Sequence, residues 1–223
     1  MPPEPEPPSP AVPSNVRRSY DAVARAYADE IYSELQSKPF DCALLDRFAE
    51  RVRGEGWACD LGCGPAQIAR YLGDRGVDVF GLDLSAGMLA QARRLNPDLQ
   101  FVQSSMMALG LASGSLAAIA AFYTIIHIPR QEVVAALGEM RRVLKPGACL
   151  LLTCHLGTED THHEEMLGRR VSLDIALFTT EEMTGYLQTA GFQVDEALER
   201  DPYAPEVEYQ SRRGYILAST PKR

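Results

Sequence analysis

The sequence predicts an α/β fold with one mostly parallel sheet and helices on both of its faces. Two observations predict it. Short apolar runs that fit buried strands alternate with longer stretches of helical spacing, and glycine, proline and polar clusters separate the two kinds of segment. With 223 residues, 46% of them hydrophobic, the chain can bury one sizeable core. One domain is therefore expected, over residues 15–223.

Two helices are expected before the first strand, at residues 15–32 and 41–52, because apolar side chains recur there at helical spacing. Residues 1–14, by contrast, are rich in proline and have scarcely any bulky apolar side chain. Such a segment cannot bury surface, so we expect a disordered or polyproline-like tail.

The central part of the chain supplies most of the expected strands. They cover residues 57–61, 77–83, 99–103, 117–123 and 148–155. The helix after the second strand should begin near Ser85, a good N-cap, and end before Pro97. A longer helix is expected from about Arg130 to Leu144, before Lys145-Pro146-Gly147. This alternation of strand and helix is typical of a parallel sheet.

The alternation stops after residue 155. Residues 156–178 are polar and irregular, and the length of this connection favours a functional cover or an extra short helix. Thr179-Thr180-Glu181-Glu182 then forms a capping box for a helix that reaches Ala190, with Gly191 as its stop. Two final strands are expected at residues 192–198 and 213–219.

Composition disfavours several classes of function. The formal net charge of -8 argues against a surface that follows nucleic-acid phosphates. The five cysteines are odd in number and form no C-x-x-C pair, which disfavours a disulfide framework or a zinc site. The sequence shows no apolar run of membrane-spanning length and no basic-then-apolar leader. We therefore expect a cytoplasmic protein with neither a nucleic acid nor a membrane as its partner.

A glycine turn and an acid mark the expected binding site. Residues 60–66 read Asp-Leu-Gly-Cys-Gly-Pro-Ala, between the first strand and a helical stretch at residues 67–72. Glycine tolerates positive φ and lets a ligand approach the backbone closely. Asp83 would end the neighbouring strand, where its carboxylate can accept both hydroxyl hydrogens of a ribose, in the crevice beyond the carboxyl ends of the strands. The pair predicts a nucleoside-binding site.

Details of the turn separate two ligand families. A dinucleotide fingerprint would place a third glycine at Gln67, so a nicotinamide-dependent oxidoreductase is the weaker alternative. Asp60, in front of the first glycine, can instead attract the ammonium of a ligand with a cationic methionine end, directly or through water.

From about Tyr20 to Ala218 the chain resembles the class I S-adenosylmethionine-dependent methyltransferases, in particular the type 11 small-molecule group. Residues 60–66 match the first motif of that family, residues 81–85 (Gly-Leu-Asp-Leu-Ser) match the second, and residues 142–152 match the late strand-entry motif. The resemblance implies a Rossmann-like three-layer α/β/α sandwich with seven strands in the order 3-2-1-4-5-7-6, the last of them antiparallel. It also implies S-adenosyl-L-methionine as the cofactor, with S-adenosyl-L-homocysteine as its product.

The resemblance also implies which residues bind the cofactor. They are Tyr20, Tyr27, Asp60, Gly62, Cys63, Gly64, Asp83, Leu84, Met88, Ser105, Met106 and Phe122. Tyr20 and Tyr27 lie where related enzymes fold N-terminal lid helices, here about residues 15–54, over the cofactor. The alternative is that these tyrosines only pack a helix onto the sheet. Cys63 is expected as a small residue of the turn.

The expected adenine loop departs from the family pattern. Relatives often use an acid after the third strand, and Ser105 stands in its place here. Its hydroxyl could accept the same hydrogen bond, while Met106 could offer an apolar face and a backbone N–H. The alternative is an ordinary loop at the end of a strand.

Two histidines are candidates for a catalytic base. His127 follows the fourth strand, at the methyl-donor end of the crevice, and His155 ends the fifth. A neutral imidazole can take the proton of a hydroxyl as that hydroxyl is methylated. Either histidine could instead orient or position its surroundings.

The acceptor pocket is expected to include aromatic and charged residues, although those near the C-terminus could equally be plain surface. The substrate-binding candidates are Tyr123, Phe178, Tyr203, Tyr209 and Arg212. The histidines and glutamates of residues 155–165 fit no helical pair of metal ligands, so no metal is expected. The same acids could attract an amine substrate.

The expected activity is transfer of a methyl group to an oxygen of a small metabolite, since two histidines flank the donor end. A small amine or a peptide is the alternative acceptor, because an uncharged amine needs little help from a base. A catalytically inactive cofactor-binding regulatory subunit is the alternative of another class. The sequence leaves both a monomer and a homodimer open.

Overall fold

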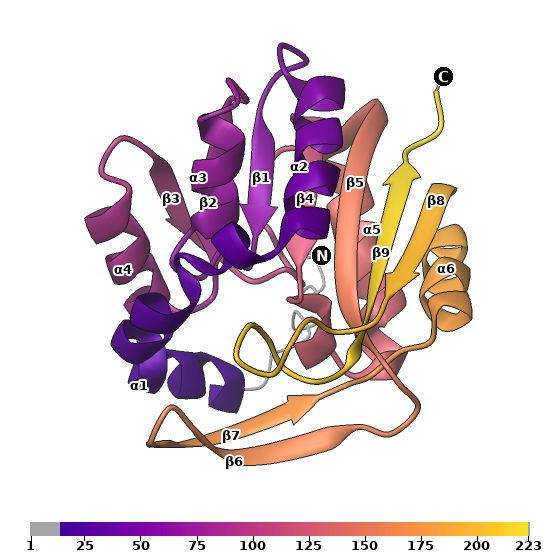
Figure 1. The fold of residues 1–223 in the computed structure, drawn as a ribbon. Helices are drawn as coiled ribbons and strands as arrows, with labels where there is room; N and C mark the ends of the chain where they lie inside the picture. The colour runs from indigo at the N-terminus through magenta and orange to yellow at the C-terminus, as the bar shows by residue number, and fades with distance from the viewer. Residues whose placement is uncertain (1–13, 223) are drawn as a thin grey trace, which may run out of the picture.

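A seven-stranded sheet forms the centre of the fold (Figure 1). The computed structural model describes residues 14–222. The strands of this sheet are β1 (Ala58–Leu61), β2 (Val79–Asp83), β3 (Gln100–Gln103), β4 (Leu116–Phe122), β5 (Leu144–Leu156), β8 (Gln193–Arg200) and β9 (Arg212–Ser219). Their order is β3-β2-β1-β4-β5-β9-β8, and β9 runs antiparallel to both of its neighbours. The predicted strand order and the predicted antiparallel strand are confirmed.

Helices cover both faces of the sheet. One face carries α2 (Pro39–Val52), α3 (Gln67–Gly73) and α4 (Ala86–Leu95), and the other carries α5 (Val133–Val143) and α6 (Thr180–Thr189). Successive side chains of a strand point to opposite faces, so Ala118 and Ala120 of β4 join the core under α2 and α3, while Ile119 and Ala121 join the core under α5 and α6. The three-layer prediction is confirmed.

Helix ends follow the local capping chemistry. The Ser85 hydroxyl accepts from Met88 N at 3.0 Å and starts α4. At α6 the Thr179 hydroxyl accepts from Glu182 N at 3.1 Å, and the Glu182 carboxylate accepts from Thr179 N at 2.8 Å. Both predicted caps are confirmed. Short 3-10 turns are η1 (Glu34–Ser37), η2 (Ile125–His127) and η3 (Arg130–Glu132), the last of which begins the predicted helix at Arg130.

A β-hairpin occupies the segment for which a cover or a short helix is expected. Its strands are β6 (Thr161–Met166) and β7 (Arg169–Ile175), joined at Leu167 and Gly168, which both have positive φ. The prediction of a helix is wrong, because apolar residues alternate in β7 with a period of two, so that one side of the strand is buried.

Helix α1 (Ser14–Ile31) lies with this hairpin at the carboxyl ends of the parallel strands (Figure 1). Val23 of α1 packs in one apolar cluster with Val171 and Leu173 of β7. The Ser19 hydroxyl also accepts from Ser172 N at 2.9 Å. The prediction of a tail at residues 1–14 lies outside the described residues, apart from Ser14, where α1 begins. None of the helices within residues 14–222 is both long enough and apolar enough to cross a membrane.

Candidate functional site

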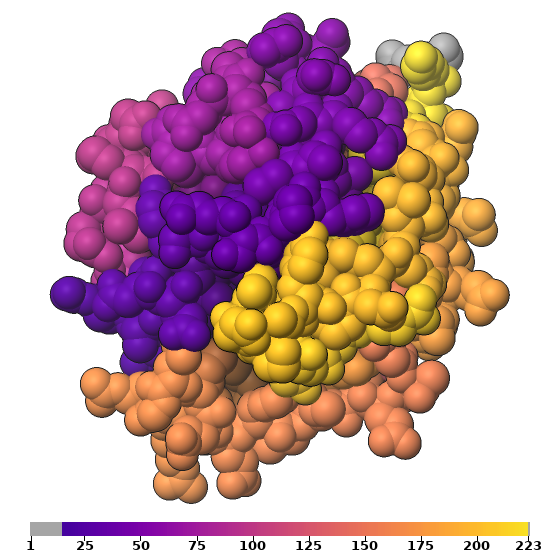
Figure 2. Space-filling view, viewed as in Figure 1, coloured from indigo at the N-terminus to yellow at the C-terminus, as the bar shows by residue number. Residues whose placement is uncertain are grey.

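A cavity of about 440 Å³ lies at the carboxyl ends of β1, β2, β4 and β5, a size within the roughly 300–1,000 Å³ range of small-molecule sites. Helix α1, the β6–β7 hairpin and the loop at residues 201–211 complete its walls. In Figure 2 the indigo N-terminal segment meets the yellow C-terminal segment, with the orange hairpin beneath both. Segments from both ends of the chain therefore enclose one site.

The glycine turn forms one wall of the cavity. Gly62 and Gly64 have φ of 70° and 53°. A Cβ added to Gly62 would lie 2.1 Å from the Thr124 hydroxyl oxygen, so this position needs glycine for space as well as for conformation. Gly62 N and Cys63 N both donate to Leu82 O, at 2.7 and 3.0 Å, which holds the turn against β2.

Asp83 is held between this turn and α4. One carboxyl oxygen accepts from Gly64 N at 2.8 Å and the other from Ser85 N at 2.8 Å. Burial raises the pKa of Asp83, and these backbone hydrogen bonds act in the opposite direction. Each carboxyl oxygen has a further lone pair, so the group can still accept hydroxyl hydrogens from a ligand in the cavity.

Asp60 is buried beneath the turn, with an exposed fraction of 1%. Its carboxyl accepts from Ala69 N at 2.9 Å. Burial, with a smaller contribution from the charge of Asp83, raises the pKa of Asp60 to about 7. A cationic group bound nearby would favour the ionised form, so this carboxyl suits a positively charged ligand.

Asn in place of Asp60 is expected to stabilise the ligand-free protein at high pH. The folded-state pKa of about 7 exceeds the usual aspartate value of 3.8, so stability is lost as pH rises between these values. Asp60→Asn should raise the free energy of unfolding by about 1–3 kcal/mol at pH 8 and change it little at pH 4. Urea unfolding at both pH values measures this, with exposed Asp78→Asn as the control. Equal gains at the two pH values would contradict the role of the Asp60 charge.

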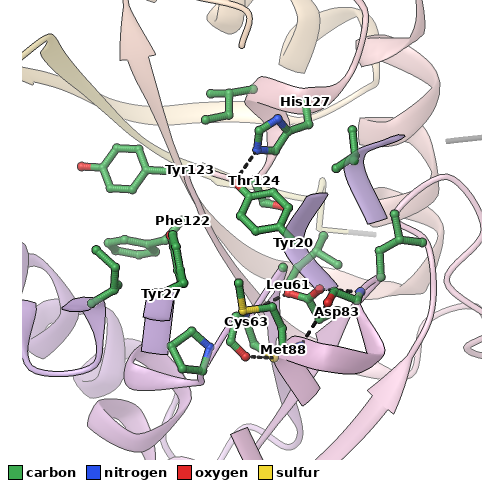
Figure 3. A pocket seen from close by; sticks show the side chains of 18 of the residues that line it. Tyr20, Tyr27, Leu61, Cys63, Asp83, Met88, Phe122, Tyr123, Thr124 and His127 are labelled. Carbon is green, nitrogen blue, oxygen red and sulfur yellow. Dashed lines mark hydrogen bonds between the residues drawn. The ribbon is translucent and has the colours of Figure 1, made fainter. Parts of the chain in front are cut away.

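Three aromatic side chains, Tyr20, Tyr27 and His127, connect α1 to the part of the cavity that follows β4 (Figure 3). The rings of Tyr20 and Tyr27 meet edge to face at 5.8 Å, and the Tyr20 hydroxyl lies 2.7 Å from His127 Nε2. His127 Nδ1 lies 3.1 Å from Asp174 O, which can only accept, so Nδ1 carries the hydrogen and Nε2 accepts from Tyr20. Burial lowers the pKa of His127. A neutral His127 therefore links α1, η2 and β7.

His155 has the opposite tautomer. Its Nδ1 lies 2.7 Å from Arg213 Nη1, which can only donate, and 2.7 Å from the Ser211 hydroxyl. Nε2 therefore carries the hydrogen. Burial, and after it the charge of Arg213, lowers the pKa of His155 to about 3. The prediction of His155 as a base is contradicted, because its lone pair is occupied; the alternative of a positioning role remains.

The loop after β3 also reaches the cavity. Ser105 and Met106 both line it. The Ser105 hydroxyl accepts from Met107 N at 3.1 Å, so part of its hydrogen-bonding capacity is used within its own loop. Its adenine role stays a prediction.

The structure brings every predicted cofactor contact to this one cavity, and their binding roles remain predictions. These residues are Tyr20, Tyr27, Asp60, Gly62, Cys63, Gly64, Asp83, Leu84, Met88, Ser105, Met106 and Phe122. His127, His155, Tyr123 and Tyr209 line it as well.

Three predicted substrate contacts do not line the cavity. Phe178 is fully buried in the core beside Tyr186. The Tyr203 hydroxyl accepts from Phe40 N at 2.9 Å, which ties that side chain to α2. Arg212 is exposed and pairs with Glu199. The alternation of β9 turns the next residue, Arg213, inward instead.

The sequence gives no local signal for a buried charge cluster beside the cavity. Glu208 Oε2 lies 3.4 Å from Lys38 Nζ and 3.5 Å from Arg213 Nη2, and all three side chains line the cavity.

The histidines and acids of the β6–β7 hairpin do not all face the cavity, because successive side chains of a strand point to opposite sides. His163 and Glu165 line the cavity, while the exposed His162 pairs with Asp174 at 2.7 Å.

Residues 58–147 match a family model described as "Methyltransferase domain". The demethylmenaquinone methyltransferase of Beutenbergia cavernae is 34% identical over 142 residues, which cover 63% of this chain and 58% of the relative. The malonyl-[acyl-carrier protein] O-methyltransferase of Enterobacter lignolyticus is 36% identical over 122 residues, which cover 55% of this chain and 47% of the relative. The chain thus spans about half the length of these curated relatives.

The fold is similar to that of the [4+2]-cyclase SpnF, with a TM-score of 0.71 and 20% identity over 96% of this chain and 98% of that one. A match at this identity supports the fold and not the reaction. The matched domain, the sheet order and the glycine turn with Asp83 together support a class I S-adenosylmethionine-dependent methyltransferase domain in this chain.

Proposed function

We propose that the protein transfers a methyl group from S-adenosylmethionine to an oxygen of a small-molecule acceptor. The observation that carries the proposal is Asp83, whose two carboxyl oxygens are anchored by Gly64 N and Ser85 N at the wall of a cavity of about 440 Å³. Asp60 lies below the same turn, where it suits a cation. The methyltransferases among the curated relatives support this assignment.

The residues of the cavity fit this cofactor. Asp83 would accept from the ribose hydroxyls, Gly62 and Gly64 leave room for the ligand beside the backbone, and Met88 offers an apolar surface. When bound, S-adenosylmethionine supplies an electrophilic methyl group. The cavity closed by α1 and the hairpin would exclude water and hold an acceptor oxygen in line with that group.

An acceptor hydroxyl must lose its proton as it is methylated. The Tyr20 hydroxyl occupies the only lone pair of neutral His127, so a proton would pass from the acceptor to Tyr20 and from Tyr20 to His127 Nε2. Asp174 O would hold the imidazole in the tautomer that this transfer requires. An amine is the second candidate acceptor, because Glu165 lines the cavity and could attract it.

Titration calorimetry with S-adenosylhomocysteine and with NADH, followed by incubation with labelled S-adenosylmethionine and a panel of hydroxyl and amine acceptors, tests the proposal. We expect affinity for S-adenosylhomocysteine and label transfer to an oxygen. Affinity for NADH alone would overturn the methyltransferase assignment. Cofactor binding without transfer to any acceptor would favour an inactive regulatory subunit.

Ala in place of Asp83 is expected to weaken cofactor binding. The loss of charged hydrogen bonds to the ribose should cost about 1–3 kcal/mol, measured as the dissociation constant of S-adenosylhomocysteine by calorimetry. Asp78→Ala is the matched control, because Asp78 is exposed and precedes the same strand at its opposite end. Circular dichroism checks that the turn and α4 survive. An unchanged dissociation constant would refute the role of Asp83.

A further inference from the structure

His155 lies between two tyrosine rings at the β5 side of the cavity. Its ring is 4.9 Å from that of Tyr123, at an interplanar angle of 32°, and 5.7 Å from that of Tyr209, at 86°. All three side chains line the cavity, and the charged Arg213 and Glu208 lie beside them in its wall. The faces of the Tyr123 and His155 rings suit a flat ring.

Arg213 holds the His155 imidazole in place through its Nδ1 atom. The arginine is 2% exposed, and its Nη1 and Nη2 donate to Ser211 O at 2.8 Å and to Tyr209 O at 2.6 Å. These bonds leave the guanidinium little freedom, so Nη1 is held at 2.7 Å from His155 Nδ1. The hydrogen of His155 is thereby confined to Nε2, and the adjacent positive charge makes this N–H a stronger donor.

The Nε2–H group faces accessible space. Within residues 14–222 no protein group accepts this hydrogen, and Nε2 is not among the enclosed polar atoms that lack a partner. Since His155 lines the cavity, a polarised donor with no protein partner is available to a ligand there. A donor of this kind binds a carbonyl or carboxylate oxygen.

We propose that the acceptor is an aromatic hydroxyl compound with a carbonyl or carboxylate oxygen beside the methylated hydroxyl, and that His155 binds this second oxygen. This inference rests on the proposed function, because it assigns the methylated hydroxyl to Tyr20 and His127. Arg213 is a positioning residue that acts through His155.

Two compounds of nearly equal shape test the inference by calorimetry. The ring of 2-hydroxyacetophenone carries a carbonyl beside its hydroxyl, and 2-ethylphenol carries a methylene in the same place. With S-adenosylhomocysteine present, the wild-type protein should bind the first about tenfold more tightly or better, as expected for one polarised hydrogen bond. His155→Phe should bring the ratio near one, and His155→Gln, whose amide N–H reaches the place of Nε2, should restore it.

Arg213→Met should lower the same ratio, while Arg212→Ala, at the exposed neighbouring position, should leave it unchanged. A wild-type ratio near one, or a ratio unaffected by His155→Phe, overturns the inference. The titrations are repeated without S-adenosylhomocysteine, whose own binding is measured separately. Failure of that cofactor product to bind overturns the proposed function, whereas its binding without a carbonyl preference overturns only the choice of acceptor.

Discussion

Leu in place of Arg200 is expected to lower the free energy of unfolding by about 3–5 kcal/mol, because it leaves two buried carboxylates without their main partner. Arg200 Nη2 lies 3.0 Å from Asp41 Oδ2 and 3.0 Å from Glu208 Oε2. The side chains of Asp41 and Glu208 are 1% and 2% exposed. Arg200 Nε also donates to the Tyr215 hydroxyl at 2.8 Å, so one guanidinium joins α2, the loop at residues 201–211 and β9.

The exposed pair of Arg47 and Glu196 provides a matched control. Like the bond between Arg200 and Asp41, this pair joins β8 to α2, with Arg47 Nη2 2.6 Å from Glu196 Oε2 and exposed fractions of 57% and 35%. Solvent screens such a pair, so Arg47→Leu should cost at most about 1 kcal/mol. Urea unfolding of both variants at pH 7 compares them. Equal losses of unfolding free energy in Arg200→Leu and Arg47→Leu would show that burial does not determine how much the Arg200 cluster stabilises the fold.

In the wild-type protein, low pH should remove the stabilisation that the Glu208 carboxylate gains from Arg200. Burial by itself would raise the pKa of Glu208, but hydrogen bonds from Arg200 and Tyr203 N lower it to about 2. Because the folded-state pKa lies below the usual glutamate value of 4.5, the stabilisation is complete above that value and is lost as pH falls towards 2. Since Glu208 and Arg213 both line the cavity, loss of this cluster should also loosen its wall.

Sequence patterns predict those parts of the structure that depend on short segments. Ser85 and Thr179 cap their helices because a side chain and a backbone N–H three residues away settle the geometry locally. Asp83 is predictable for a similar reason, since its place at the end of a strand next to the glycine turn follows from chain order. Its two anchoring hydrogen bonds are visible only in the fold.

The wrong predictions concern residues whose surroundings come from distant segments. Arg212 and Arg213 are adjacent and chemically identical, and only the register of β9 against β5, which pairs Arg213 with His155, turns one inward. Phe178 pairs through its backbone with the end of β5, 22 residues earlier in the chain, and its ring is buried in the core. Arg200 and Asp41 lie far apart in the sequence, so no local spacing predicts their pairing.

The chemical role of His155 also depends on a residue that lies far away in the sequence. A histidine at the end of a strand beside a cavity fits a base or a donor equally well. The partner at Nδ1 decides between them, and that partner is supplied by β9. His127 remains a candidate base, because its Nδ1 donates to a backbone carbonyl oxygen and its Nε2 can therefore accept a proton.

Asn in place of His127 is expected to lower kcat by roughly 10²–10⁴-fold, the usual contribution of a general base. The asparagine amide can still donate to Asp174 O from the place of Nδ1, but no acceptor remains where Nε2 meets the Tyr20 hydroxyl. The affinity for S-adenosylhomocysteine should therefore change little. His162→Asn, at an exposed histidine of the hairpin, is the control.

The pH profile and a second variant separate a proton acceptor from a residue that only holds the hairpin. Burial places the pKa of His127 below its usual 6.5, so wild-type kcat should be level above that pH and fall below it. In His127→Asn the rate should instead rise with pH, as the acceptor hydroxyl ionises without help. Tyr20→Phe should cause a similar loss, and the double variant should be no slower than either single one, because both residues carry the same proton. Additive losses with an unaltered pH profile would reduce His127 to an orienting residue.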